Sequence, residues 1–225
     1  MQNLEETLNL IKQNPTFETY YEKLVSFNEK VNLTSITECE DVFVKHFLDS
    51  VLPIDEIKQN ASVVDVGTGA GFPSLPIKIV RPDIKLTMVD ALNKRVEFLN
   101  QLTKDIHINS TNVHARAEDF CKETREKFDV AVARAVARLN TLCEYLLPLV
   151  KVGGIVLAYK GSSADDEILE AKNAINILGG KVEKVLTFTL PNNAGERNII
   201  VIKKIRPTPA KYPRGGNQPK LNPIL

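Results

Sequence analysis

Cysteine is scarce in this chain of 225 residues. The three cysteines, Cys39, Cys121 and Cys143, lie far apart, and none forms the CxxC pair that is typical of metal and redox sites. We therefore expect core or free thiols in a reducing compartment, with no disulfide and no bound metal.

Long apolar runs are missing as well. No segment approaches the roughly 20 consecutive apolar residues that a membrane-spanning helix needs. Residues 1–6 are polar and acidic, which is not typical of a signal peptide. An apolar share of 43% with 25% charged residues is nevertheless enough for a folded core. We expect a cytoplasmic protein that has no membrane partner.

Acidic residues are absent from the end of the chain, although the net charge of the whole is only +1. Glu196 is the last acidic residue, and only Lys and Arg carry charge after it. A surface that contacts phosphate and a C-terminus that merely improves solubility both fit such a pattern. Charge alone does not choose between them.

The apolar periodicity changes near residue 60. Residues 1–55 have helical stripes, whereas later segments alternate between short apolar runs and helical periods. This alternation predicts an α/β fold with a doubly wound, mostly parallel sheet, and two final runs without a helix between them predict one antiparallel strand. We expect a helical extension (1–55), a main domain (56–205) and a basic tail (206–225). The expected strands are residues 61–66, 84–89, 112–115, 128–133, 154–158, 181–190 and 198–203.

A glycine-rich turn follows the first of these strands. Gly67, Gly69 and Gly71 allow a sharp turn and a close approach of the backbone to a ligand. The spacing is GxGxG, preceded by Asp65 in the strand, whereas a dinucleotide-binding loop has GxGxxG. It resembles motif I of class I (Rossmann-like) methyltransferases and disfavours the alternative, a nicotinamide-dependent oxidoreductase.

Asp90 ends the second strand. A carboxylate at this position accepts hydrogen bonds from the ribose hydroxyls of an adenosine-containing cofactor. NAD and S-adenosylmethionine both carry that ribose, so Asp90 supports a nucleoside ligand without choosing between them. A helix cap is the structural alternative for this residue.

The end of the fourth strand narrows the chemistry. There we favour a ligand or phosphate contact for Arg134 over a structural ion pair. The sequence is Ala133-Arg134-Ala135-Val136, not the (Asp/Asn/Ser)-Pro-Pro-aromatic motif of enzymes that methylate exocyclic amines. Cys143 lies too deep in a helical pattern for covalent attack on a pyrimidine. These absences favour a reaction without amine placement or covalent catalysis.

Residues 65–73, Asp-Val-Gly-Thr-Gly-Ala-Gly-Phe-Pro, resemble the signature of the RsmG (GidB) family of 16S ribosomal RNA guanine-N7 methyltransferases. Ser74 departs from the glycine that usually follows this signature, and Lys45 stands where arginine is common. The similarity nevertheless extends over nearly the whole chain. Further ordered blocks are residues 32–34, 45–50, 92–99, 115–119, 134–137, 160–161, 196–197 and 211–214.

The resemblance implies that S-adenosylmethionine is the cofactor and that N7 of the guanine at position 527 of 16S RNA is the target. The partner would be that RNA in the small ribosomal subunit or its precursor, and the enzyme would be a monomer. Together with the turn and Asp90, the resemblance gives as cofactor-binding residues Gly67, Gly69, Phe72, Asp90, Ala117, Glu118 and Arg134. The expected RNA contacts are Arg197, Lys211 and Arg214.

The implied reaction requires no general base, because guanine N7 carries a lone pair and no proton. We therefore expect no catalytic acid or base, and among the histidines only His46 lies in a family block. A small-molecule methyltransferase is an alternative, which the basic tail with Tyr212 and Arg214 disfavours. A non-catalytic ribosome-assembly factor is another, which the intact glycine turn and Asp90 disfavour.

Overall fold

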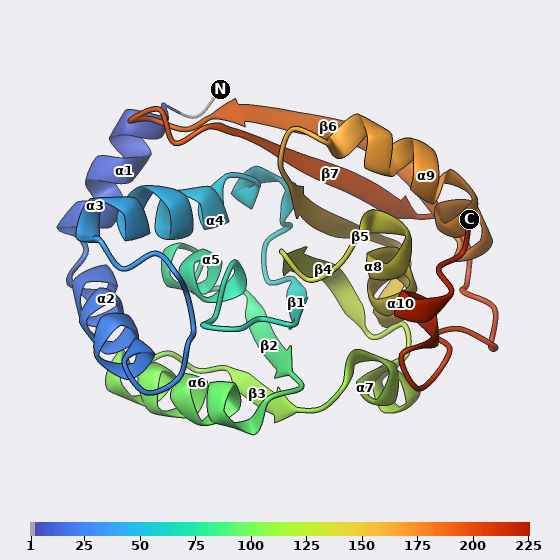
Figure 1. Cartoon of the computed structure of the whole chain (residues 1–225), viewed down its shortest axis with the longest axis horizontal. Coiled ribbons are helices and arrows are strands. Elements are labelled where there is room, and N and C mark those ends of the chain that lie inside the picture. Colours follow the sequence, from blue (N-terminus) through green and yellow to red (C-terminus); the bar gives the residue numbers. More distant parts are fainter. Residues whose placement is uncertain (1–2) are drawn as a thin grey trace.

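A computed structural model describes residues 3–225 as a seven-stranded sheet with helices on both faces (Figure 1). The strands are β1 (Ser62–Val66), β2 (Lys85–Asp90), β3 (Thr111–His114), β4 (Phe128–Arg134), β5 (Val150–Lys160), β6 (Gly180–Thr189) and β7 (Glu196–Lys204). The α-helices are α1 (Leu4–Gln13), α2 (Pro15–Asn28), α3 (Cys39–Val42), α4 (Asp49–Val51), α5 (Ser74–Val80), α6 (Asn93–Asp105), α7 (Ala117–Thr124), α8 (Leu139–Leu146), α9 (Ala164–Ile177) and α10 (Gln218–Leu221). A π-helical segment, Phe43–Leu48, joins α3 to α4, and short 3₁₀ turns span Ile54–Glu56 and Leu147–Leu149.

The strand order is β3-β2-β1-β4-β5-β7-β6. Strands β1 to β5 pair in parallel, whereas β7 runs antiparallel to both of its neighbours. The structure therefore confirms the doubly wound, mostly parallel sheet with one antiparallel strand. The order reverses between β1 and β4, and ligands of such sheets bind outside the carboxyl ends of the strands at this switch point.

All seven expected strands are present, and β5 is the one whose length differs most from the expectation. It begins at Val150 rather than at residue 154. Residues 151–153 are exposed, so they carry no apolar pattern that would reveal a strand. Val150 pairs with Phe128 and Ile155 pairs with Val130, so residues 151–154 lie in an irregularity of the register between β4 and β5.

Successive side chains of a strand point to opposite faces of the sheet and pack into two separate hydrophobic cores. Val63 of β1 packs with α5, α6 and the N-terminal helices, whereas the next residue, Val64, packs with α7, α8 and α9. In Figure 1 these two groups of helices lie on opposite sides of the sheet. Phe17, Tyr20 and Phe47 are fully buried in the first core. The expected helical extension is therefore part of the layer that covers one face of the sheet.

The C-terminal segment, residues 206–225, folds back onto the body instead of extending into solvent. Thr208, Tyr212 and Pro219 are buried. The guanidinium group of Arg125, which follows α7, donates hydrogen bonds to three main-chain carbonyls of the segment. Within residues 3–225 no helix is long and apolar enough to cross a membrane.

Candidate cofactor and target site

The glycine-rich turn joins β1 to α5 at the switch point of the sheet. Gly67 has a φ of +71°, and a Cβ atom built there would lie 2.9 Å from Cγ2 of Val136. Gly69 also has a positive φ, and no heavy atom lies within 4 Å of the position of its Cβ. The first glycine is thus required by both backbone and packing, whereas the second leaves open space beside the loop.

Helix α2 supports this turn from behind. The hydroxyl group of Tyr20 donates a hydrogen bond of 2.6 Å to the carbonyl of Ala70, and a Cβ atom at Gly71 would lie 2.6 Å from that hydroxyl oxygen. The Tyr20 ring also stacks on Phe72, with ring centroids 5.4 Å apart. The N-terminal helices therefore shape the loop, a role that sequence reasoning left open because Tyr20 carries no local motif.

Asp90 lies at the carboxyl end of β2, beside the turn. Its side chain is 3% exposed, and its Oδ2 atom accepts a hydrogen bond of 2.9 Å from the main-chain N–H of Gly69. Its Oδ1 atom accepts one from Leu92, the N-cap of α6, and Arg95 lies 3.4 Å from Oδ2. Asp90 thus fixes the turn and the start of α6 together.

Asp65 is buried behind the same turn. The main-chain N–H of Ser74, at the start of α5, donates a hydrogen bond of 3.3 Å to its Oδ2 atom. Burial raises the pKa of Asp65 to about 7, against the opposing effect of the hydrogen bond from the main-chain N–H of Ser74. A carboxyl group that titrates near neutrality therefore lies beneath the loop.

A cavity of about 160 Å³ opens between the turn and the loop after β3. Of the predicted cofactor residues, Gly67, Ala117 and Glu118 line it together. Tyr145 and Asn217 line it too, and sequence reasoning did not predict either. The position at the switch point and the side-chain-free loop fit the nucleoside part of an adenosine-containing cofactor.

The remaining predicted cofactor residues lie around this cavity without lining it. Asp90 stands between Val89 and Ala91, which both line the cavity, and it accepts a hydrogen bond from the main-chain N–H of Gly69. Phe72 is buried, and its ring centroid lies 5.0 Å from the Arg134 guanidinium carbon. Contact of these side chains with the cofactor stays a prediction.

A second cavity, of about 320 Å³, lies next to the ends of β4 and β5 and is lined by Arg134, Asp49 and Arg197 among others. Asp49 is 1% exposed, and its carboxylate lies between the two arginines. Arg134 binds its Oδ2 atom, and Nε of Arg197 lies 3.1 Å from its Oδ1 atom. For Arg134 we favoured a ligand or phosphate contact over a structural ion pair, and the structure contains such an ion pair. Its partner, Asp49, lies in a helix 85 residues earlier in the chain, so no local sequence pattern reveals it.

His46 belongs to this site. Its ring stacks on Phe72 with centroids 4.5 Å apart, and its Nδ1 atom lies 3.1 Å from Nη2 of Arg134. The same Nδ1 atom lies 3.2 Å from the carbonyl oxygen of Lys45, and Nε2 lies 2.8 Å from Oγ1 of Thr34. Burial, followed by the charge of Arg134, lowers the pKa of His46 to about 3. The imidazole is therefore neutral and holds Arg134 and Phe72 in place.

The structure does not gather the three predicted RNA contacts. Arg197 lines the second cavity, and Lys211 is exposed on the C-terminal segment. Arg214 instead makes an ion pair of 2.7 Å with Glu144, whose side chain is fully buried. Lys204 is buried as well, beside Glu126. Part of the C-terminal positive charge thus serves to dock the segment, which the charge pattern alone did not reveal.

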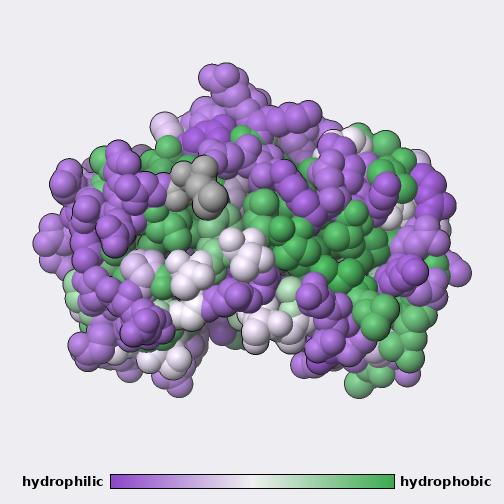
Figure 2. Space-filling model, turned by 90° about the horizontal axis from the view of Figure 1, so that it is seen from above, coloured by the Kyte–Doolittle hydropathy of each residue, from purple (hydrophilic) through white to green (hydrophobic). Residues whose placement is uncertain are grey.

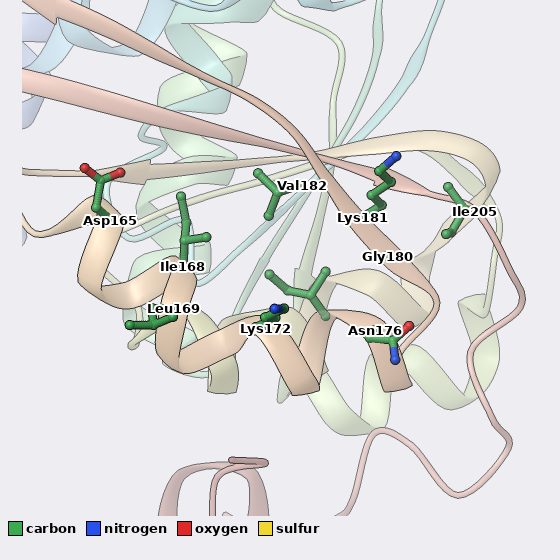
Figure 3. A pocket seen from close by; sticks show the side chains of 10 residues that line it. Asp165, Ile168, Leu169, Lys172, Asn176, Gly180, Lys181, Val182 and Ile205 are labelled. Carbon is green, nitrogen blue, oxygen red and sulfur yellow. The ribbon is translucent and has the colours of Figure 1, made fainter.

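A hollow larger than both of these cavities lies elsewhere, between α9 and the start of β6 (Figure 3). It has a volume of about 620 Å³, and Ile168, Leu169 and Ile205 line it. Figure 2 shows apolar side chains gathered between hydrophilic margins toward the side of α9. Not one of the predicted site residues lines this hollow. We therefore place the candidate site at the two smaller cavities, because the predicted residues line those and not the larger hollow.

Comparison with known proteins agrees with this geometry. The family model for rRNA small subunit methyltransferase G (GidB) matches residues 13–200. A protein named ribosomal RNA small subunit methyltransferase G from Lactobacillus johnsonii is 52% identical over 220 residues, which cover 95% of this chain and 92% of the relative. A protein of the same name from Staphylococcus carnosus is 49% identical over 231 residues, which cover 100% of this chain and 96% of the relative.

Solved structures share the fold at much lower identity. An rRNA methylase from Streptococcus thermophilus has a TM-score of 0.51 at 16% identity, covering 71% of this chain and 95% of its own. TYW2 from M. jannaschii, solved in complex with AdoMet, has a TM-score of 0.54 at 15% identity, covering 68% of this chain and 73% of its own. These likenesses confirm the Rossmann-like methyltransferase fold.

The family match spans most of the chain, and the relatives are about half identical over nearly its whole length. It confirms the resemblance carried by residues 65–73 and by the blocks around them. The chain belongs to the rRNA small subunit methyltransferase G (GidB) family, whose members are S-adenosylmethionine-dependent methyltransferases of ribosomal RNA.

Proposed function

We propose that this enzyme methylates N7 of a guanine in 16S ribosomal RNA, at position 527 as the family resemblance implies. The observation that carries the proposal is the placement of two cavities on either side of one short segment. Arg134 and Ala135 line the larger cavity, and Val136 lines the smaller one beside the glycine turn. A nucleoside cofactor in the smaller cavity would present its reactive end toward the larger one, where the base would enter.

S-adenosylmethionine supplies an electrophilic sulfonium methyl group at this site. We assign to its nucleoside the turn at Gly67 and Gly69, the carboxylate of Asp90 for the ribose hydroxyls, and Ala117 with Glu118 for the adenine. Phe72 and Arg134 would border the methyl group, since Phe72 follows the turn, Arg134 lines the larger cavity, and the Arg134 guanidinium carbon lies 5.0 Å from the Phe72 ring centroid.

The larger cavity suits a base that needs no deprotonation. Asp49 is engaged by two arginines, and Glu167 is paired with Lys160 at 2.7 Å. Both ring nitrogens of His46 already have partners, and its low pKa makes the neutral imidazole a weak base that does not take up a second proton near neutrality. Guanine N7 needs no base because its lone pair is free. The chain would therefore act by positioning and water exclusion, which well-oriented systems make worth about 7–11 kcal/mol.

The cavity is lined by Lys160 and Arg197, whose side chains could make the site selective for guanine. Arginine and lysine pair with the O6 and N7 edge of guanine. A donor from Arg197 or Lys160 to O6 would hold the base and leave the N7 lone pair free for the methyl group. Specific RNA recognition uses unstacked bases, so we assign the small subunit or its precursor as partner, with the enzyme acting as a monomer in the cytoplasm.

The test is methyl transfer from labelled S-adenosylmethionine to small ribosomal subunits from a strain that lacks the enzyme. The product RNA is mapped by cleavage specific to 7-methylguanosine, with naked 16S RNA and precursor particles as parallel substrates. We expect a single cleavage at the proposed guanine. Label at another atom or base would overturn the assignment of N7, and cofactor binding without any transfer would favour the assembly-factor alternative.

A further inference from the structure

The C-terminal segment, residues 206–225, is anchored next to the nucleoside cavity. Arg214 contacts Glu144 of α8 through both its main-chain N–H and its guanidinium group. One turn earlier on the same helix, Oγ1 of Thr141 donates a hydrogen bond of 2.9 Å to the carbonyl of Pro219. Tyr145, the neighbour of Glu144, lines the cavity. Helix α8 thus holds the segment with some residues and forms a cavity wall with another.

Between these anchors the segment reaches the cavity itself. Asn217 lines the cavity together with Gly67, Ala117 and Glu118. Its backbone is left-handed, with a φ of 64°, and it is the N-cap of the short helix α10. The Asn217 side chain thus lies at the cavity, while Pro219, two residues later, is buried.

The hydrogen bonding of Asn217 determines which group it can offer. Nη1 of Arg116 donates to the side-chain oxygen of Asn217 at 3.1 Å. Because arginine cannot accept, the amide oxygen must face Arg116, and the amide nitrogen points elsewhere. In the structure of residues 3–225 that nitrogen donates no hydrogen bond. An adenine presents ring-nitrogen acceptors of the kind that an Asn amide pairs with.

We propose that the C-terminal segment is a wall of the cofactor site, in which the Asn217 amide donates to the adenine and Arg116 holds it in position. The proposal rests on the assignment of S-adenosylmethionine to this cavity. Because the ligand would then contact the body and the segment at once, cofactor binding and docking of residues 206–225 stabilise each other. Such a coupling is reciprocal by thermodynamic necessity.

Calorimetric titration with S-adenosylhomocysteine, without RNA, tests the contact. The variant Asn217→Gly keeps the left-handed backbone and removes the amide. Loss of one hydrogen bond should weaken binding roughly threefold to tenfold. The control is Gln218→Ala, an exposed neighbour that does not line the cavity, and it should bind as the wild type does. Equal affinity of Asn217→Gly and the wild type would overturn the proposed contact.

Hydrogen exchange of the main chain tests the coupling. Saturating S-adenosylhomocysteine should slow the exchange of residues 206–225 in the wild type, and the effect should shrink in Asn217→Gly. Exchange that slows only around the glycine turn, with no change in residues 206–225, would show that the segment is not part of the cofactor site. The same measurement without ligand shows that the variant is folded.

These experiments separate this inference from the proposed function. Absence of binding by the wild type would overturn the cofactor assignment and, with it, this inference. Equally tight binding of S-adenosylhomocysteine by the wild type and by Asn217→Gly would overturn this inference alone. Methyl transfer to RNA is not an element of either measurement, so the identity of the target base does not affect the result.

Discussion

The hydroxyl group of Tyr20 donates a hydrogen bond to the carbonyl of Ala70, and this bond joins helix α2 to the glycine-rich turn across 50 residues of sequence. Both groups are buried. We predict that Tyr20→Phe lowers the free energy of unfolding by about 1–2 kcal/mol, because the Ala70 carbonyl loses its partner in the interior. Cofactor affinity should fall as well, since the turn loses its support.

Urea denaturation and cofactor titration check this prediction. Tyr21→Phe is the matched control, because its hydroxyl donates to Thr37 at an exposed position. That variant should change neither quantity measurably. If Tyr20→Phe bound the cofactor as the wild type does, the Tyr20 hydroxyl would not support the cofactor-binding conformation of the turn, and helix α2 would contribute only to the hydrophobic core.

Gly67→Val should abolish cofactor binding. The new side chain would have to adopt a φ of +71°, and its Cβ atom would lie 2.9 Å from Val136. A β-branched residue is a marked outlier at positive φ. Calorimetry measures the loss, and thermal unfolding shows whether the variant still folds. Micromolar binding by a folded Gly67→Val would contradict the role of the turn.

His46 should make stability depend on acid pH. The folded state resists protonation down to about pH 3, whereas the unfolded histidine takes a proton below 6.5. The unfolded state therefore binds more protons in this window, and stability falls as the pH drops from 6.5 toward 3. In His46→Gln this contribution should be absent, so its unfolding free energy should decline less steeply than that of the wild type. Parallel slopes in urea denaturation would contradict the low pKa.

Asp65 should act in the opposite sense. The folded state keeps its proton up to about pH 7, whereas the unfolded carboxyl loses it at 3.8. The folded state therefore binds more protons in this window, and stability falls as the pH rises from 3.8 to about 7. Asp65→Asn should remove that fall in the ligand-free protein. Equal declines in the variant and the wild type would show that Asp65 is ionised throughout this range in the folded state.

Arg214→Ala should destabilise the protein by about 2 kcal/mol. Removing one partner of a buried pair costs about 3–5 kcal/mol, and we reduce this because the Arg214 side chain is 30% exposed. Glu144→Ala combined with Arg214→Ala should cost less than the two single changes together. Lys211→Ala, on the same segment but exposed, should leave stability unchanged. Weaker RNA binding by a fully stable Arg214→Ala would instead support a direct RNA contact.

Sequence alone predicted the features that depend on neighbouring residues. The strands appeared because apolar side chains alternate with the backbone pleat, and the turn appeared because three glycines follow a strand. Gly67 followed from the glycine-rich turn, whereas Ala117 and Glu118, which line the same cavity, were implied by the family resemblance. β5 was predicted too short because its exposed start has no apolar pattern.

The tertiary structure alone decided the partners of the charged and aromatic side chains. Arg134 binds Asp49 from 85 residues away, and Arg214 binds Glu144 from 70 residues away, so neither pairing leaves a local pattern. The sequence does not distinguish a C-terminal lysine or arginine that faces RNA from one that pairs with a buried carboxylate. Only the packing of residues 206–225 against the body places Asn217 at the cavity that Gly67 lines. Local periodicity and backbone sterics thus determined the sheet and the turn, whereas long-range burial of charge determined which residues surround them.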